Sequence, residues 1–248
     1  MRVPNIHGTI KRRLLVNYRV DPDVIGRILP RPFRPKLHQG SAIAGICLIR
    51  LEDMRPRSFP LAPGLSSENA AHRIAVVWDD ETGSHEGVYI PRRDTGSFVN
   101  HLIGGRLFPG EHHRASFRVT DEEERIDIHM RSADGQVELK IVGHTAGELP
   151  ASSLFRTVHE ASAFFEGGAI GYSATSSGNR LDGIQLKTDS WHVKPFAVER
   201  AFSSYFEDRA WFPAGTVCFD CGLVMRNLRH AWETADDMYL TSRDRCAS

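Results

Sequence analysis

The sequence has few of the features that place a protein in a membrane or outside the cell. None of the apolar runs in its 248 residues is long enough to cross a bilayer. The N-terminal stretch MRVPNIHGTI has no long apolar core, so we expect no secretory signal peptide. Four cysteines are too few for a disulfide framework in a chain of this length. These absences predict a cytoplasmic protein with no membrane partner.

The sequence also lacks the excess charge that would direct it to a polyanion. Lysine and arginine together number 31, and aspartate and glutamate also number 31. No nucleic-acid recognition motif accompanies this balance, so we expect no nucleic-acid partner. The hydrophobic content of 41% and the charged content of 25% are typical of a soluble globular protein. A chain of this length can bury a sizeable core.

The patterns that are present mainly predict β-strands. Ser41–Leu51 is almost continuously apolar, which is typical of a buried strand. Apolar and polar residues alternate over 126–131 and again over 137–141, on either side of an Asp-Gly turn, which predicts a hairpin. Further strands are expected at residues 11–20, 70–78, 87–90, 115–119, 183–200 and 215–232.

Two short helices are expected between the strands. Asp21 offers an N-cap directly before a proline, and the helix that it starts should end before Pro30. Thr157–Phe165 carries apolar side chains at helical spacing and is followed by a pair of glycines. Residues 53–66 hold three prolines and a glycine, so they are expected to form a loop.

These elements predict a mainly β (α+β) fold with a few short helices. Many short strands separated by turn signals favour a barrel or a sandwich. No linker or internal repeat interrupts the pattern, so residues 1–240 are expected to form a single domain. Residues 241–248 are polar and are expected to form a disordered tail.

The segment 105–114 (GRLFPGEHHR) is the strongest candidate for chemistry. Glycine and proline set the course of its backbone, and histidines and arginines follow. A neutral imidazole at His113 suits a general acid or base near neutral pH. Its neighbour His112 would face the other way on a strand, so at most one of them points inward. The alternative is a hydrogen-bonded histidine without a chemical role.

A second polar cluster consists of Glu68, His72 and Arg73, beside an apolar strand. Polar side chains next to a buried strand must find partners, often one another. Glu68 is therefore a candidate acid or base, and the alternative is a structural Glu68–Arg73 ion pair. His72 is a weaker candidate for substrate binding.

Arginines supply candidate anion-binding groups. Arg92 and Arg93 stand together before Asp94, and a planar guanidinium suits bidentate capture of a carboxylate. An internal ion pair with Asp94 explains the same residues. Arg106 and Arg114 add two further cations. Together they predict a small anionic substrate.

We predict no metal site. The pair Cys218 and Cys221 has no second pair to complete a zinc site, and we expect both to be small core residues. The cluster of His72, His112, His113 and Glu68 contains metal-ligand residue types but lacks the spacing of a zinc hydrolase.

Several segments carry a family resemblance: Arg12–Asp21, Gly45–Arg50, Ser66–Arg73, Gly87–Asp94 and Gly104–Pro109. They resemble the YqjF-like family, a domain-of-unknown-function family in the acetoacetate decarboxylase-like superfamily, over most of residues 1–235. This resemblance implies a cone-shaped β-barrel with flanking sheet and helices and a pocket inside the barrel. Relatives of this fold often assemble, so it also implies a possible homo-oligomer.

The resemblance implies roles for individual residues. In the decarboxylases a Gly-Arg dipeptide precedes a Schiff-base lysine, and a second lysine depresses the pKa of that nucleophile. Aligned on Gly105-Arg106, the nucleophile position falls on His113 and the second lysine on Arg114. A pocket glutamate of the decarboxylases matches Glu68.

The same alignment excludes the decarboxylase mechanism itself. Imidazole cannot form the iminium that a primary amine forms with a ketone. An arginine of the decarboxylase pocket falls near Lys11 or Arg12, and neither register is preferred. None of the lysines lies near the motif in sequence: Lys11, Lys36, Lys140, Lys187 and Lys194.

We therefore predict a cofactor-independent enzyme that acts on a small carboxylate- or carbonyl-containing metabolite in a β-barrel pocket. Glu68 and His113 would transfer protons in lyase, isomerase or cyclase chemistry. Arg93, Arg106 or Arg114 would bind the anion and stabilise an enolate-like charge. The alternative is a non-catalytic small-molecule-binding protein that retains the barrel.

Overall fold

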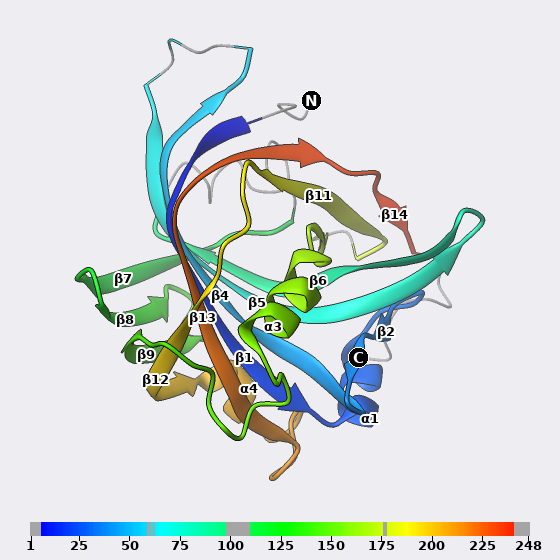
Figure 1. The fold of residues 1–248 in the computed structure, drawn as a ribbon. Helices are drawn as coiled ribbons and strands as arrows, with labels where there is room; N and C mark the ends of the chain where they lie inside the picture. The colour runs from blue at the N-terminus through cyan, green and yellow to red at the C-terminus, as the bar shows by residue number, and fades with distance from the viewer. Residues whose placement is uncertain (1–5, 59–60, 62, 98–109, 176–177, 241–248) are drawn as a thin grey trace.

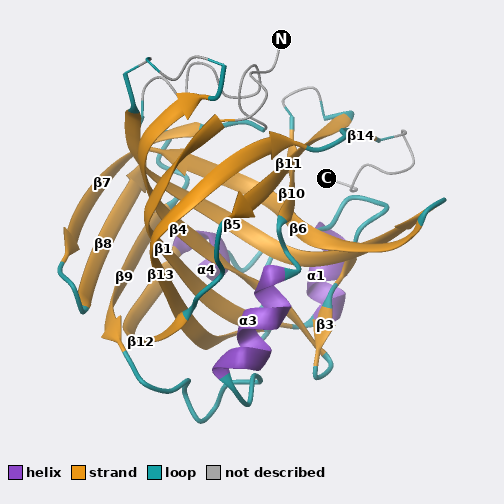
Figure 2. Cartoon of the chain, turned by 45° about the horizontal axis from the view of Figure 1, so that its top comes forward, coloured by secondary structure: helices purple, strands orange, loops and turns teal. Residues whose placement is uncertain are grey.

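The computed structural model describes residues 6–58, 61, 63–97, 110–175 and 178–240. Its elements are β1 (Ile6–Val20), α1 (Pro22–Ile28), β2 (Arg34–Pro35), β3 (Leu37–His38), β4 (Ser41–Pro56), β5 (Leu65–Asp80), β6 (Gly83–Thr95), β7 (His113–Asp121), β8 (Arg125–Ser132), β9 (Glu138–Thr145), α3 (Val158–Glu166), β10 (Ile170–Ala174), β11 (Arg180–Thr188), β12 (Lys194–Ser203), α4 (Ser204–Glu207), β13 (Val217–Thr234) and β14 (Met238–Tyr239). The prediction of a mainly β fold with a few short helices is confirmed (Figure 2).

Both predicted helices form where the capping residues place them. The Asp21 side chain accepts a hydrogen bond from the backbone N–H of Asp23 at 2.8 Å, and a proline occupies the first turn of α1. The Thr157 hydroxyl accepts from the backbone N–H of Glu160 at 3.1 Å and starts α3. Satisfying an orphan N–H in this way fixes the start of each helix.

The strands belong to one sheet that closes on itself twice (Figure 1). The first ring runs β6-β7-β8-β9-β12-β13-β1-β4-β5 and closes through the β5–β6 pairing. The second ring leaves β6 through β10 and β11 and returns through the β11–β13 pairing. The strands β13, β1, β4, β5 and β6 are therefore shared by both rings. The single domain expected over 1–240 stays a prediction, although this one sheet extends from β1 to β14.

The shared strands carry buried side chains on both faces, which explains the nearly continuous apolar sequence of β4 over Ser41–Leu51. Successive side chains of β1 alternate between two clusters: Leu14 and Val16 pack into the first core, and Leu15 packs into the second. The first core continues into β8 and β9 through residues such as Ile128. The second core packs against α3 through Phe165.

The loop expected over residues 53–66 is wrong at its two ends, whereas the described residues between Pro56 and Leu65 form no strand. β4 continues to Pro56, because it pairs with β1 along almost its whole length and the last pair is Ile6 with Pro56. β5 already begins at Leu65. A bulge at Asp53, whose φ is 54°, bends the strand there. Proline is tolerated at the end of a strand, where few ladder hydrogen bonds are lost.

The cysteine prediction is confirmed at one residue and wrong at the other. Cys221 is fully buried in the second core. Cys218 is exposed, although a bulge at Asp220 places it on the same face as Cys221: Cys218 stands opposite Arg19 and Cys221 opposite Asn17. This face is not covered at the start of β13. Cys47 is buried, and all three are reduced thiols.

No helix among the described residues is long and apolar enough to cross a membrane. The predicted polar tail at 241–248 and the predicted substrate residue Arg106 lie outside the described residues.

Candidate functional site

His113 begins β7 and lies beside a network of buried charges. β7 pairs in parallel with β6, so His113 stands opposite Asp94. The His113 Nδ1 is 3.3 Å from Asp134 Oδ2, and 29% of its side chain is exposed. Hydrogen bonds to Asp134 from Ser132, from the Gln136 backbone N–H and from an arginine outweigh its partial burial and lower its pKa to about 2. The imidazole therefore has a carboxylate partner that stays charged at neutral pH.

Arg92 binds that carboxylate and so contributes to the same network. Its guanidinium donates to Asp94 at 2.8 Å, to Asp134 at 2.9 Å and to Gln136 at 3.2 Å. Burial raises the pKa of Asp94, and Arg92 offsets this only in part. The internal ion pair anticipated for Arg92 and Asp94 is therefore present. It leaves Arg92 little capacity to hold a substrate.

Arg114 and His72 lie on either side of this network in different environments. Arg114 follows His113 on β7 and is exposed at the surface. His72 is 1% exposed, its Nε2 is 2.9 Å from the Ser203 hydroxyl, and its ring packs on Tyr205 at 4.5 Å. Burial, together with the charge of Arg92, lowers the pKa of His72 to about 3. His72 is thus a neutral core side chain at physiological pH.

Glu68 is bound by Arg12. The Arg12 guanidinium donates to Glu68 Oε2 at 2.6 Å and to Asp121 Oδ2 at 2.8 Å, and Arg12 is only 1% exposed. Burial raises the pKa of Glu68 despite the opposing charges of Arg12 and Arg50. A carboxyl with a raised pKa beside a cation is suited to exchange a proton. Of the two registers left open by the sequence, it is Arg12 that contacts Glu68.

The structural ion pair considered for Glu68 and Arg73 does not form. The two residues are five apart on β5, and an odd spacing places side chains on opposite faces of a strand. Arg73 instead bonds to the amide oxygen of Asn17 and lies over the Phe165 ring, 4.8 Å from its centroid. It therefore faces the second core.

Arg73 belongs to a group of three arginines around the Cys47 thiol, which we call the arginine cluster: Arg13, Arg73 and Arg93. The Arg13 Nε donates to Cys47 Sγ at 3.4 Å. Arg93 Nε donates to the Ser173 hydroxyl at 2.8 Å on β10, and its charge interacts with Cys47. Only Arg93 was predicted from the sequence as a substrate-binding residue.

The arginine cluster has unused hydrogen-bond donors. Arg13 Nη1, Arg73 Nε and Arg93 Nη2 are buried without a hydrogen-bond partner among the described residues. Within the same described part of the chain, no ion pair joins these arginines to a carboxylate. The charge of Asp182 raises the pKa of Arg93, but this carboxylate already binds Arg180 at 3.0 Å and the Gly110 backbone N–H at 3.0 Å.

The electrostatics of the arginine cluster favour an anion. Burial, with Arg13 adding to it, lowers the pKa of Arg73 to about 10, and burial lowers that of Arg93 to about 10. Buried charges are costly unless they are paired, so a bound anion would relieve this cost. The space beside Arg13 and Arg73 is about 20 Å³, which is room for about one water molecule.

The cluster and the predicted acid–base groups lie on opposite faces of the shared strands. The partner of Glu68, Arg12, alternates along β1 with Arg13, which donates to Cys47 of the second core. No hydrogen bond or ion pair between described residues joins Glu68 to His113. Each of these two residues instead has its own charged partner, Arg12 or Asp134.

Two buried neutral histidines predict acid sensitivity. His72 has a pKa of about 3, and burial, with smaller contributions from Arg13 and His7, lowers that of His230 to about 4. Unfolding exposes both rings to water, where the pKa is about 6.5. Below pH 6.5 the two histidines become protonated in the unfolded state but stay neutral in the folded state. Stability is therefore complete above pH 6.5 and falls as the pH is lowered toward 4.

For His72→Gln, the loss of unfolding free energy between pH 7 and pH 5 should be smaller than in the unmodified protein by roughly 2 kcal/mol. Urea unfolding at the two pH values measures this. The control is His144→Gln, which changes an exposed histidine paired with Glu199 and should leave the loss unchanged. Equal losses in the protein and in His72→Gln would show that His72 does not contribute.

Among the described residues, no group of three or more histidine, cysteine, aspartate or glutamate side chains is arranged to hold a metal ion.

The family of the chain follows from its sequence over most of its length. The model of the family DUF2071, described as an uncharacterized conserved protein, matches residues 8–212. The chain belongs to this family. The predicted resemblance to a domain-of-unknown-function family is thereby confirmed. No curated protein matches the chain.

Solved structures share the fold of this DUF2071 protein. Acetoacetate decarboxylase from Legionella pneumophila has a TM-score of 0.60 at 12% identity, covering 94% of this chain and 88% of that one. The enduracididine biosynthesis enzyme MppR, complexed with pyruvate, has a TM-score of 0.58 at 13% identity, covering 98% and 92%. An acetoacetate decarboxylase-like enzyme from Sphingomonas wittichii has a TM-score of 0.57 at 10% identity, covering 97% and 94%. At these identities the likeness establishes the fold.

Proposed function

We propose that this DUF2071 protein binds a small carboxylate- or carbonyl-containing metabolite in its second ring, at the arginine cluster. The observation that carries the proposal is the set of buried guanidinium N–H groups of Arg13, Arg73 and Arg93 that lack a partner in the described part of the chain. Hydrogen bonds from a guanidinium to a carboxylate are strong and directional, and they strengthen when water is excluded. The space beside Arg13 and Arg73 holds about one water molecule, so a carboxylate binds there only if neighbouring side chains move.

The fold neighbours support a metabolite of this class. Their names refer to acetoacetate and to pyruvate, and both compounds carry a carboxylate next to or near a ketone. The position that aligns with the Schiff-base lysine of the decarboxylases is His113, and an imidazole cannot form an iminium. We therefore propose chemistry without a Schiff base.

The finer proposal is that Glu68 and His113 transfer protons to or from a metabolite of this class, as in lyase, isomerase or cyclase chemistry. It requires the metabolite to reach the face of the shared strands opposite the arginine cluster. The raised pKa of Glu68, which follows from its burial, suits a carboxyl that exchanges a proton with a substrate. His113 keeps part of its ring exposed and has a carboxylate partner that orients it.

A second candidate function is binding without chemistry. The separation of Glu68 and His113 from the arginine cluster by the shared strands favours this alternative. A small metabolite that is bound to Arg93 and Arg73 lies on one face of the shared strands. It would contact Glu68 or His113 only if it also extended to the other face.

Proton NMR in deuterium oxide distinguishes the two candidates. We expect the protein to bind pyruvate or acetoacetate and to accelerate exchange of the protons next to the ketone. Glu68→Gln and His113→Ala should abolish the exchange and leave binding intact, whereas Arg131→Gln, at a 64% exposed side chain, should change neither. Binding without exchange would establish the non-catalytic alternative. Absence of binding to either compound would contradict both candidates.

A further inference from the structure

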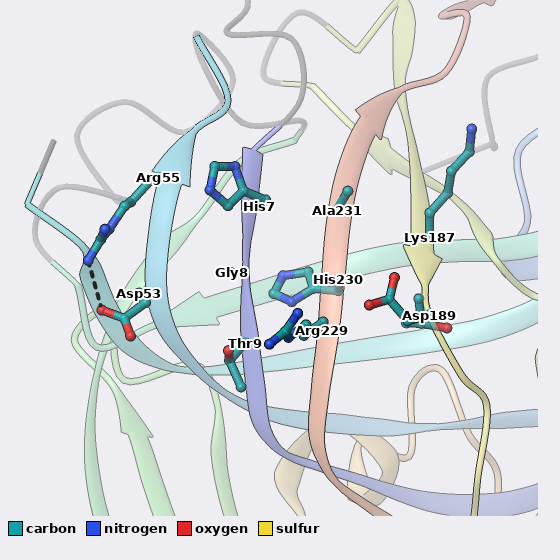
Figure 3. A pocket seen from close by; sticks show the side chains of 11 residues that line it. His7, Gly8, Thr9, Asp53, Arg55, Lys187, Asp189, Arg229, His230 and Ala231 are labelled. Atoms are coloured by element: carbon teal, nitrogen blue, oxygen red, sulfur yellow. Dashed lines mark hydrogen bonds and ion pairs between the residues drawn. The ribbon is translucent and has the colours of Figure 1, made fainter. Parts of the chain in front are cut away.

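A pocket of about 510 Å³ opens where β1, β4, β11 and β13 run side by side (Figure 3). The charges that line it do not converge. Arg229 is exposed and the next residue on β13, His230, is buried, so the two side chains face opposite ways. Asp53 lies 3.3 Å from Arg55, which gives this carboxylate its own partner. The arginine cluster differs from this pocket, because its side chains converge on one thiol, that of Cys47.

The strand pairing places Arg93 in line with the Cys47 thiol. Cys47 of β4 stands opposite Ala71 of β5, and Ala71 stands opposite Arg93 of β6. Side chains that stand directly opposite each other in neighbouring strands share a face of the sheet. Ala71 carries only a methyl group, so the Arg93 guanidinium can extend over it toward Cys47. The electrostatic interaction between Arg93 and Cys47 agrees with this path.

Arg13 and Arg73 approach the same thiol from the two strands beside β4. Arg13 of β1 stands opposite Ile49, and Arg73 of β5 stands opposite Gly45. Both of these β4 residues are two positions from Cys47 and therefore lie on its face. A long side chain can reach across such a diagonal. The Arg13 Nε donates to Cys47 Sγ at 3.4 Å, and the charge of Arg73 interacts with the same sulfur.

A sulfur surrounded by three guanidinium groups is suited to attack a hydroperoxide. The thiolate is the nucleophilic form of cysteine, and neighbouring arginines stabilise it. The same cations stabilise the negative charge that develops on the leaving oxygen. Cys47 is only 6% exposed, and the space beside Arg13 and Arg73 holds about one water molecule. These dimensions favour hydrogen peroxide, which is only slightly larger than water, over a bulky oxidant.

The oxidised sulfur would use hydrogen-bond donors that are unused in the reduced protein. Arg13 Nη1, Arg73 Nε and Arg93 Nη2 are buried without a hydrogen-bond partner among the described residues, and Arg73 is only 5% exposed. Leaving buried donors unpaired is costly. A sulfenate oxygen is negatively charged and would accept from them. Oxidation to the sulfenate adds a single oxygen atom, which matches the small space beside the cluster.

The described cysteines include no thiol that could convert this sulfenate to a disulfide. Cys221 lies on β13, and β1 runs between β13 and β4. Two strand spacings amount to about 9.5 Å, whereas the Cα atoms of a disulfide are at most about 7 Å apart. Cys218 lies still further along β13. The oxidised form of Cys47 is therefore expected to persist as a sulfenate.

We propose that Cys47 is a site of oxidation by hydrogen peroxide, activated and stabilised by the arginine cluster. The thiolate sulfur attacks one oxygen of the peroxide, so that an S–O bond forms as the O–O bond breaks. The proton of the attacked oxygen passes to the leaving oxygen, which departs as water. Sulfur loses two electrons, the peroxide gains them, and the product is a sulfenate. The reaction does not require the metabolite of the proposed function.

The rates of oxidation in the folded and the unfolded protein test the proposal. After a timed exposure to hydrogen peroxide, catalase stops the reaction, and the protein is unfolded with dimedone, which captures sulfenates. Mass spectrometry of the peptides then reports each cysteine separately. Cys47 should react at least tenfold faster in the folded protein than in protein unfolded beforehand in urea, and at least tenfold faster than the exposed Cys218. Slower reaction of Cys47 in the folded protein, as expected for a thiol that is merely buried, would overturn the proposal.

Variants test the role of the arginines. Arg13→Gln removes the donor to the sulfur and should slow the oxidation of Cys47 at least tenfold. The matched control is Arg19→Gln on the same strand, because Arg19 donates to Cys218 Sγ at 3.5 Å and should not affect Cys47. Arg93→Gln provides a second variant with the same expected loss, and thermal unfolding confirms that each protein is folded. Unchanged rates in both Arg13→Gln and Arg93→Gln would overturn the proposal. Neither experiment uses pyruvate, so this proposal and the proposed function can fail separately.

Discussion

Arg93→Gln should weaken the binding of pyruvate about tenfold or more and should leave the ligand-free protein at least as stable as before. Truncating one donor to a carboxylate removes a charge-assisted hydrogen bond, and a tenfold change corresponds to about 1.4 kcal/mol. The same substitution removes a buried positive charge that has no carboxylate partner among the described residues. The substitution is therefore expected to weaken pyruvate binding and to preserve or increase the stability of the ligand-free protein.

The sign of the stability effect follows from the pKa of Arg93. Burial lowers that pKa to about 10, so folding disfavours the charged form at every pH below that value. Glutamine has no charge to bury and can still donate to Ser173. The midpoint of thermal unfolding without ligand should stay the same or rise, and Arg131→Gln should leave it unchanged. A marked drop in the midpoint of Arg93→Gln would mean that Arg93 has an anionic partner in the folded protein itself.

Arg12→Met should have the largest effect on stability. Arg12 is 1% exposed and binds Glu68 and Asp121, so its removal leaves two partly buried carboxylates without their shared cation. Breaking a buried ion pair by removing one partner costs about 3–5 kcal/mol. Urea unfolding at pH 7 measures this loss. The loss should shrink toward acidic pH, because protonation of Glu68, whose pKa burial already raises, removes the uncompensated charge.

The double variant Arg12→Met/Glu68→Gln provides the matched control. It removes the second charge as well, so part of the lost stability should return, as expected for two groups in direct contact. Additive losses from the two substitutions would contradict the interaction between Arg12 and Glu68.

Much of the fold is predictable from local sequence. The hairpin of β8 and β9 forms with Ile128 opposite Ile141 and Met130 opposite Leu139, because apolar residues alternate on both sides of an Asp-Gly turn. α1 starts after its predicted N-cap Asp21, and α3 forms where apolar side chains recur at helical spacing over 157–165. The extension of β4 and β5 into residues 53–66 was not predictable, because the pairing with β1 that supports it joins residues far apart in the chain.

The candidate site is less predictable, for a physical reason. Alternation tells which side chains of a strand share a face, but not which face another ring will cover. Glu68 and Arg73 stand near each other in sequence and point into different cores. One signal was available: Arg13 and Arg73 border the apolar runs of strands buried on both faces, and a charge in such a place needs a partner. The grouping of Arg93 with them depends on β10 and on Cys47, which no local pattern reveals.

Isothermal titration of pyruvate into the protein and into Arg93→Gln tests the central claim, that the arginine cluster binds a small anion. We expect saturable binding of pyruvate that weakens at least tenfold in Arg93→Gln and is unchanged in Arg131→Gln. Equal affinities in all three proteins, or no binding to the unmodified protein, would contradict it.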